Sequence, residues 1–243
     1  MPVNNCNYSS SPKGSSKADP GWLKLNWPLY ASAGMSDVGG IYGQTQRFST
    51  LYETLKSLRN EHVGLGRMGW NVVNDAADAL NTITKYDSTI NKVSVESGIP
   101  KAIIQAILFR EQIFYSLSDA TDVARVKFGH ATGLNKVSDK FNSASIGLGQ
   151  IFSETAMAAE KRILGAEYSR DEMSRRLQDD TTNIHYVALV LAYEVDRAKI
   201  DLNNGNGEDI ERLLAKYNGT GDAAVQYGRE TYQYYEAFKR YNQ

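Results

Sequence analysis

Proline is confined almost entirely to the start of this 243-residue chain. Four of its five prolines lie within the first 28 residues, and the other is Pro100. Because proline lacks a backbone donor and clashes with the preceding turn, it interrupts helices. We therefore predict an irregular extension over residues 1–45 and a helix-compatible remainder. Trp22 and Trp27 in the extension are expected to dock on the body of the protein, with partner binding as the alternative.

Apolar residues after Gln46 recur mostly at three- and four-residue intervals, which is typical of amphipathic helices. Two such helices are predicted between Phe48 and Leu58 and between Val72 and Ile83. Further helices are predicted at 153–164, 170–178, 181–199, 208–217 and 229–240. Apolar and polar residues never alternate convincingly over five positions, so strands are expected to be few and short. The fold class is therefore mainly α.

The segment 101–114 is apolar on nearly every side, and Ser97–Pro100 before it is typical of a helix start. A helix without a polar face belongs in the middle of a domain. We therefore predict a buried central helix here.

The charges of the chain nearly cancel, with 27 Lys and Arg against 28 Asp and Glu. Proteins that hold nucleic-acid phosphates normally carry a surplus of positive charge, so we expect no nucleic-acid partner. With one cysteine and three histidines, an intramolecular disulfide is impossible and a Cys/His zinc site is nearly so. We expect no metal and no cofactor, and any chemistry then rests mainly on carboxylates, hydroxyls or amides.

The longest apolar stretches, 102–109 and 186–193, fall far short of the roughly 20 residues that cross a bilayer. Residues 1–16 are polar and rich in Ser and Asn, unlike the basic and apolar regions of a secretory signal. We therefore expect neither a membrane span nor an export signal.

Glu111 is the most informative residue, because it interrupts the apolar stripe of the predicted central helix. Three apolar residues precede it by seven, four and three positions and share its face: Ile104, Ile107 and Leu108. Loss of solvation there would raise the pKa of the carboxyl group toward neutrality, as a general acid requires. The alternative is a structural salt bridge, but the adjacent Arg110 points a quarter-turn or more away. Position alone leaves both readings open.

Two further motifs bring glycines beside polar side chains. In Ser145–Ile151, glycines at two-residue spacing allow unusual dihedrals and close approach of a ligand to the backbone. Lys216–Gly221 places Tyr217 and Asn218 at a helix end, where Asn218 or Gly219 would supply a left-handed cap. Taken alone, each motif is more typical of a turn in the chain than of a functional site.

Taken in order, the motifs resemble those of the soluble lytic transglycosylases and goose-type lysozymes. Ile104–Glu111 resembles the catalytic-glutamate helix of that family. Ser145–Ile151, followed by Thr155 and Ala156, resembles its Gly-Leu-Met-Gln segment with the trailing Thr-Ala. Lys216–Gly219 is similar to its Ala-Tyr-Asn-x-Gly motif, and Gly228–Tyr234 to its Glu-Thr-Arg-x-Tyr block.

This chain departs from the family within these motifs. Gln112 replaces Ser after the catalytic Glu, Gly149 replaces Met, Lys216 replaces Ala, and Tyr232 replaces Arg. The departures bear on the fit of the substrate more than on the class of reaction.

The resemblance spans about residues 96–240, and it implies a lysozyme-like helical domain over residues 96–243. Residues 46–95 would then be accessory helices that pack on this domain. The implied reaction is cleavage of the β-1,4 bond between N-acetylmuramic acid and N-acetylglucosamine in peptidoglycan, with Glu111 as acid and then base. By family position the cleft would be lined by Ser145, Gln150, Tyr217 and Asn218, with Glu230 as a further substrate-binding candidate.

Two alternatives remain open at the level of sequence. A hydrolytic lysozyme would use a second carboxylate, for which the candidates are Asp119, Asp122, Asp139 and Glu154. A domain of the same fold could instead bind glycan without cleaving it.

The implied substrate, the glycan strands of peptidoglycan, lies in the periplasm or cell wall. Since no export signal is predicted, three hypotheses remain for how the protein reaches this substrate. A dedicated secretion system could deliver it, in which case a cognate immunity or inhibitor protein is expected. Alternatively, cell lysis could release it, or the chain could have lost its signal.

Overall fold

The computed structural model describes residues 40–63, 75–115, 124–126, 128–129, 131–133, 144–202 and 206–243, with the backbone alone for 40–45 and 63. The chain is mainly helical, as the proline distribution and apolar spacing predict. Its helices include α1 (Gly40–Val63), α2 (Ala76–Lys85), α3 (Asp87–Ser97), α4 (Lys101–Ile113), α6 (Ser153–Ile163), α7 (Arg170–Arg176), α8 (Asp180–Ala198), α9 (Gly207–Asn218) and α10 (Asp222–Tyr241). Two short strands, β1 (Ser145–Ile146) and β2 (Ile151–Phe152), pair antiparallel.

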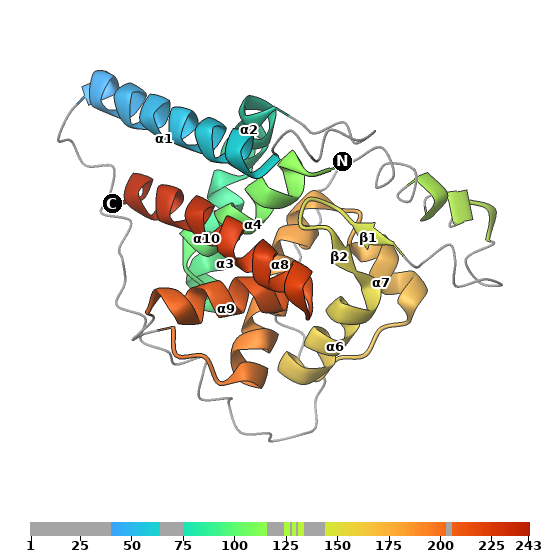
Figure 1. Ribbon diagram of the computed structural model, residues 1–243. Coiled ribbons are helices and arrows are strands. Elements are labelled where there is room, and N and C mark those ends of the chain that lie inside the picture. The colour runs from blue at the N-terminus through green and yellow to red at the C-terminus, as the bar shows by residue number, and fades with distance from the viewer. Residues whose placement is uncertain are drawn as a thin grey trace.

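Helix α4 lies at the middle of the fold (Figure 1), and residues 102–109 are all buried. The prediction of a buried helix over 101–114 is therefore confirmed. The helix begins where expected, because Gly98 ends α3 with a φ of 71° and Pro100 serves as the N-cap residue of α4. Glycine takes this left-handed conformation without the steric cost of a Cβ atom.

The remaining helices surround α4. Helix α10 crosses α4 and also packs against α9 and α1, while α8 packs against α6, α3 and α9 (Figure 1). Leu55 of α1 and Leu80 of α2 are buried in the same apolar cluster as the α4 residues. The predicted accessory helices thus share one core with the predicted domain, and the boundary at residues 95 and 96 remains a prediction.

Three sequence expectations differ from the structure. Helix α1 begins at Gly40, inside the predicted irregular extension, because its glycines weaken a helix by only about 1 kcal/mol each and do not block it. Helix α3 was not expected, since Ile90 and Val93 are the only residues that it buries. Helix α10 begins at Asp222 rather than at residue 229.

Gly228 lies inside α10 and does not interrupt the helix. A Cβ atom added to Gly228 would lie 2.8 Å from the Cβ of Ala215 and 2.6 Å from the Glu211 carbonyl oxygen. The two helices therefore approach each other closely at this point, and Gly228 is a packing residue rather than a helix breaker.

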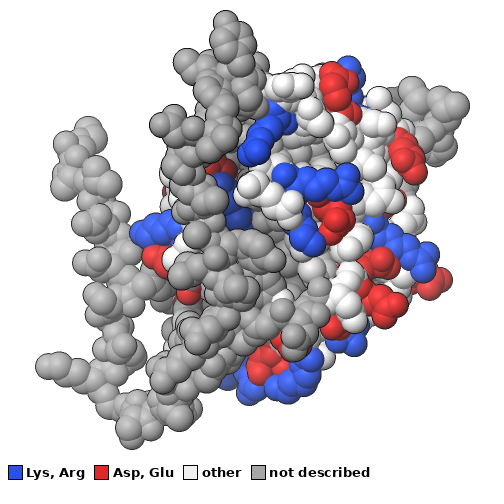
Figure 2. Space-filling model, turned by 90° about the vertical axis from the view of Figure 1, so that its left-hand side faces the viewer, with Lys and Arg blue, Asp and Glu red and all other residues white. Residues whose placement is uncertain are grey.

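Charges of both signs are interspersed among the described residues on one face of the molecule. On the face seen in Figure 2, Lys and Arg side chains lie beside Asp and Glu, and the described residues form no extended patch of one sign there. None of the helices in the described part of the chain combines the length and the apolar character needed to cross a membrane.

Candidate functional site

The glycine-rich motif forms a short hairpin. Ser145 pairs with Phe152 and Ile146 with Ile151, and residues 147–150 make the turn. Gly147 takes a φ of 75° and Gln150 a φ of 48°, so the turn holds one non-glycine residue in the left-handed region. Such a residue costs of order 1–3 kcal/mol, which its surroundings must offset.

Asn183, fully buried in α8, holds this turn by its side-chain amide. Its Nδ2 donates to the Ile146 carbonyl at 2.8 Å and to the Leu177 carbonyl at 3.0 Å, and its Oδ1 accepts from the Gly149 amide at 2.7 Å. A Cβ atom on Gly147 would lie 2.2 Å from Asn183 Nδ2. The turn therefore requires glycine at position 147 both for its backbone conformation and for space.

Helices α4 and α9 hold the same turn from other directions. Gln112 Nε2 donates to the Leu148 carbonyl at 3.0 Å, and the Tyr217 hydroxyl donates to the Gly149 carbonyl at 2.7 Å. A Cβ on Gly149 would lie 2.3 Å from a methyl group of Val187 and 2.9 Å from the Tyr217 hydroxyl. This closeness excludes a larger side chain at position 149, where the resembled family has Met.

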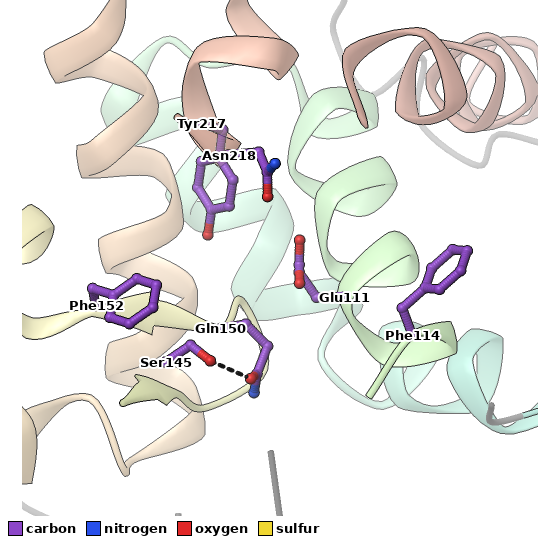
Figure 3. Close-up of a pocket in the computed structure, with 7 residues that line it drawn as sticks. All are labelled: Glu111, Phe114, Ser145, Gln150, Phe152, Tyr217 and Asn218. Atoms are coloured by element: carbon purple, nitrogen blue, oxygen red, sulfur yellow. Dashed lines mark hydrogen bonds between the residues drawn. The ribbon is translucent and has the colours of Figure 1, made fainter. Parts of the chain in front are cut away.

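A cleft of about 170 Å³ opens between the hairpin, the end of α4 and the end of α9 (Figure 3). Five predicted site residues line it: Glu111, Ser145, Gln150, Tyr217 and Asn218. The fold thus brings together residues that lie up to 107 positions apart in sequence, from Glu111 to Asn218.

Two phenylalanines that sequence reasoning missed complete the lining: Phe114 and Phe152. A signal for both was available. Phe114 follows Glu111 by three positions and so shares its helix face, and Phe152 pairs across the hairpin with Ser145. Phe152 is 51% exposed, which leaves its ring free to contact a ligand.

The Glu111 carboxylate points toward Tyr217 and Asn218 (Figure 3). It is partly buried, and the hydroxyl of Tyr227 donates to its Oε1 at 2.5 Å. Burial and the negative charge of Glu111 raise the pKa of Tyr227 well above its ordinary value, and the same two causes raise the pKa of Tyr217. Both phenols therefore remain protonated at neutral pH and act as donors.

On the hairpin side of the cleft, Ser145 and Gln150 hold each other in place. The Ser145 hydroxyl donates to Gln150 Oε1 at 2.9 Å, as Figure 3 shows, and Gln150 Nε2 donates to the Gly147 carbonyl at 2.7 Å. These contacts offset the backbone cost of the left-handed Gln150 and orient its amide beside the cleft.

Glu230, predicted to bind substrate, does not line the cleft. Its carboxylate pairs with Arg110 at 3.3 Å and accepts from Gln226 at 2.8 Å. The Arg110 guanidinium lies between two rings, 3.7 Å from the centroid of Phe114 and 4.7 Å from that of Tyr227. Arg110 therefore pairs with Glu230, and it supports the two aromatic residues that flank Glu111.

The second carboxylate of a hydrolytic lysozyme finds no support among the described residues. Glu154 pairs with Arg170 at 2.8 Å and does not line the cleft. The other three candidates, Asp119, Asp122 and Asp139, lie outside the described residues. Among the described residues that line the cleft, Glu111 is the one acid.

Within the described part of the chain, no three His, Cys, Asp or Glu side chains gather as metal ligands would. Comparisons of the chain with protein-family models, with curated proteins and with solved structures find no match.

Proposed function

We propose that this chain is a peptidoglycan lytic transglycosylase, with a lysozyme-like domain over residues 96–243. The observation that carries the proposal is the position of Glu111 in a cleft whose other polar groups come from the expected motifs: Ser145, Gln150, Tyr217 and Asn218. One acid faces hydroxyl and amide groups that can hydrogen-bond to a glycan. This arrangement suits proton transfer at a glycosidic bond.

The proposed reaction needs a single carboxyl group. Protonated Glu111 donates to the oxygen between N-acetylmuramic acid and N-acetylglucosamine as an oxocarbenium-like transition state develops. The resulting carboxylate then takes the proton from the muramoyl O6 hydroxyl, and O6 bonds to C1 to close a 1,6-anhydro ring. Tyr227, which donates to Glu111 Oε1, holds the carboxyl group in place through both steps.

The walls of the cleft suit a sugar chain. Phe114 lies beside Glu111 on α4, and Phe152 lies across the cleft on the hairpin (Figure 3). Ring faces of this kind pack against the apolar faces of sugar rings, while Ser145 and Asn218 offer hydrogen bonds to hydroxyl and acetamido groups. With a net charge of −1, the protein would depend on such contacts rather than on general attraction to an anionic cell wall.

Digestion of purified peptidoglycan tests the proposal. We expect the wild type to release muropeptides and Glu111→Gln to release none, because the amide cannot donate and then accept the proton. Glu154→Gln is the matched control, since it removes the same charge at a residue outside the cleft. Equal product from wild type and Glu111→Gln would refute the assignment.

The mass of the products separates the two reaction types. Anhydro ends, which the proposal predicts, are lighter by one water than the reducing ends that a hydrolytic lysozyme makes. Glycan binding without any release of product would instead favour the non-catalytic domain.

Action on peptidoglycan places the proposed enzyme in the periplasm or cell wall, as an exported antibacterial effector or as a bacteriolytic protein released by lysis. Directing the chain to the periplasm of a test bacterium should lyse cells, and Glu111→Gln should not. An immunity or inhibitor protein, if the chain is an effector, would protect cells that produce the wild type.

A further inference from the structure

A second pocket lies on the other side of the same hairpin and has no role in the reaction proposed above. Its volume is about 190 Å³, and it is lined by hairpin residues 146–148 and by Gln112, Tyr115, Gln178 and Asp180. We call it the flank pocket. Along α4 the two sites alternate, because Glu111 and Phe114 face the cleft while Gln112 and Tyr115 face the flank pocket.

The hairpin wall of the flank pocket is already hydrogen-bonded. The carbonyl groups of Ile146, Gly147 and Leu148 accept from Asn183, Gln150 and Gln112, respectively. These backbone oxygens are therefore held by the protein itself. Recognition of a ligand then falls mainly to the side chains of the other walls.

Asp180, the first residue of α8, is the one acidic or basic residue among the described residues that line the flank pocket. The Tyr86 hydroxyl donates to its Oδ2 at 2.5 Å and so fixes the orientation of the carboxylate. The Lys85 ammonium lies 4.8 Å from the centroid of the Tyr86 ring and does not line the pocket. A fixed carboxylate beside two amides and a phenol is suited to a ligand with a positive charge and several hydrogen-bond donors.

We propose that the flank pocket binds a primary ammonium group carried by the stem peptide of peptidoglycan, with Asp180 as its counter-ion. The inference rests on the proposed function, since it assigns a second part of the same substrate to a second site. Stem peptides branch from the muramoyl residue, and their free amines are the cationic groups of the polymer. A glycan strand held in the cleft would carry its peptide past the hairpin that separates the two sites.

Binding of a synthetic stem peptide to the full chain, measured by calorimetry, tests the inference. The probes are the peptide with a free side-chain amine and the same peptide with that amine acetylated. We expect the wild type to bind the free amine about tenfold more tightly, as for a hydrogen-bonded charged group. Asp180→Asn should bind both peptides equally, because Asn keeps the shape and the contact with Tyr86 but not the charge.

Asp179→Asn is the matched control. It removes the same charge one residue earlier, and Asn can still cap α8 as Asp179 does through its bond to the Thr182 amide at 2.8 Å. This variant should keep the preference for the free amine. Equal binding of both peptides by the wild type, or an equal loss of the preference in both variants, would overturn the inference.

Turnover in the same preparations separates this inference from the proposed function. Glycan strands stripped of their peptides should be cleaved equally by wild type and Asp180→Asn. Failure of the wild type to cleave them would count against the proposed function and leave the binding result standing. Normal cleavage without any preference for the free amine would overturn only the flank-pocket assignment.

Discussion

Replacement of Asn183 by Leu tests whether the hairpin depends on the buried amide of α8. Leu has the same branching as Asn but cannot hydrogen-bond, so the Gly149 amide and the carbonyls of Ile146 and Leu177 lose their partner. Leaving three buried backbone groups unpaired costs about 1–3 kcal/mol each, or about 3–9 kcal/mol together. Burial of the apolar side chain returns about 2 kcal/mol. The net loss is then about 1–7 kcal/mol, and we expect a value near the middle of this range, about 3–5 kcal/mol.

Denaturant unfolding followed by circular dichroism measures this loss as a change in the free energy of unfolding. Asn91→Leu, at an exposed position of α3, is the control and should change stability by less than about 0.5 kcal/mol. A loss below about 1 kcal/mol for Asn183→Leu would show that water or a rearranged turn satisfies these groups, and the proposed rigidity of the hairpin would be wrong.

Three further predictions concern other parts of the fold. Gly147→Ala should destabilise by about 2–4 kcal/mol, because the added Cβ combines a left-handed backbone with a steric clash, whereas Gly165→Ala meets only the backbone cost of about 1 kcal/mol. Leu55→Ala should cost about 2–5 kcal/mol, because this fully buried side chain joins α1 to the common core. The raised pKa values of Tyr217 and Tyr227 favour the folded state below pH 10, the ordinary pKa of tyrosine, and this contribution is lost as the pH rises from there through the folded-state pKa. The melting temperature should therefore fall above that pH, and less steeply in the double Tyr→Phe variant.

Each of these outcomes has a clear opposite. Equal losses of stability in Gly147→Ala and Gly165→Ala would show that the steric clash at position 147 does not destabilise the turn. A Leu55→Ala effect no larger than that of Val95→Ala, at a side chain that is 68% exposed, would mean that α1 does not share the core. If the melting temperature falls identically at alkaline pH in the wild type and in the double Tyr→Phe variant, other titrating groups cause the fall.

The helices that sequence periodicity predicted best are those with a dominant apolar pattern. The predicted bounds of α4 agree with the structure within one residue, because a helix that is apolar on nearly every side is recognised without deciding which face is buried. Helix α3 buries few residues, so its sequence carries little periodic signal. The predicted start of α10 at residue 229 is too late, and Gly228 lies inside the helix, where its close packing against α9 could not be predicted from the sequence.

In the candidate site, the sequence predicts residues that stand in recognisable motifs but not the contacts between residues far apart in the chain. Five of the six predicted site residues line the cleft, and each belongs to one of the motifs that carry the family resemblance. Glu230 belongs to such a motif as well but does not line the cleft: its carboxylate pairs with Arg110, which lies 120 positions away, and only the fold brings the two together. The contact of Tyr227 with Glu111 and that of Asn183 with the hairpin are also long-range, so the sequence alone does not predict them. The raised pKa expected for Glu111 stays a prediction.

The left-handed backbone of Gln150 places stability and activity in conflict at one position. Gln150→Gly would relieve the steric cost of a side chain at this φ, of order 1 kcal/mol, yet it would also delete the amide that lines the cleft and bonds Ser145. Selection for thermal stability alone should therefore favour loss of this glutamine, and selection for turnover should restore it. Under the proposed function, an engineered thermostable form of this protein has to gain its stability elsewhere.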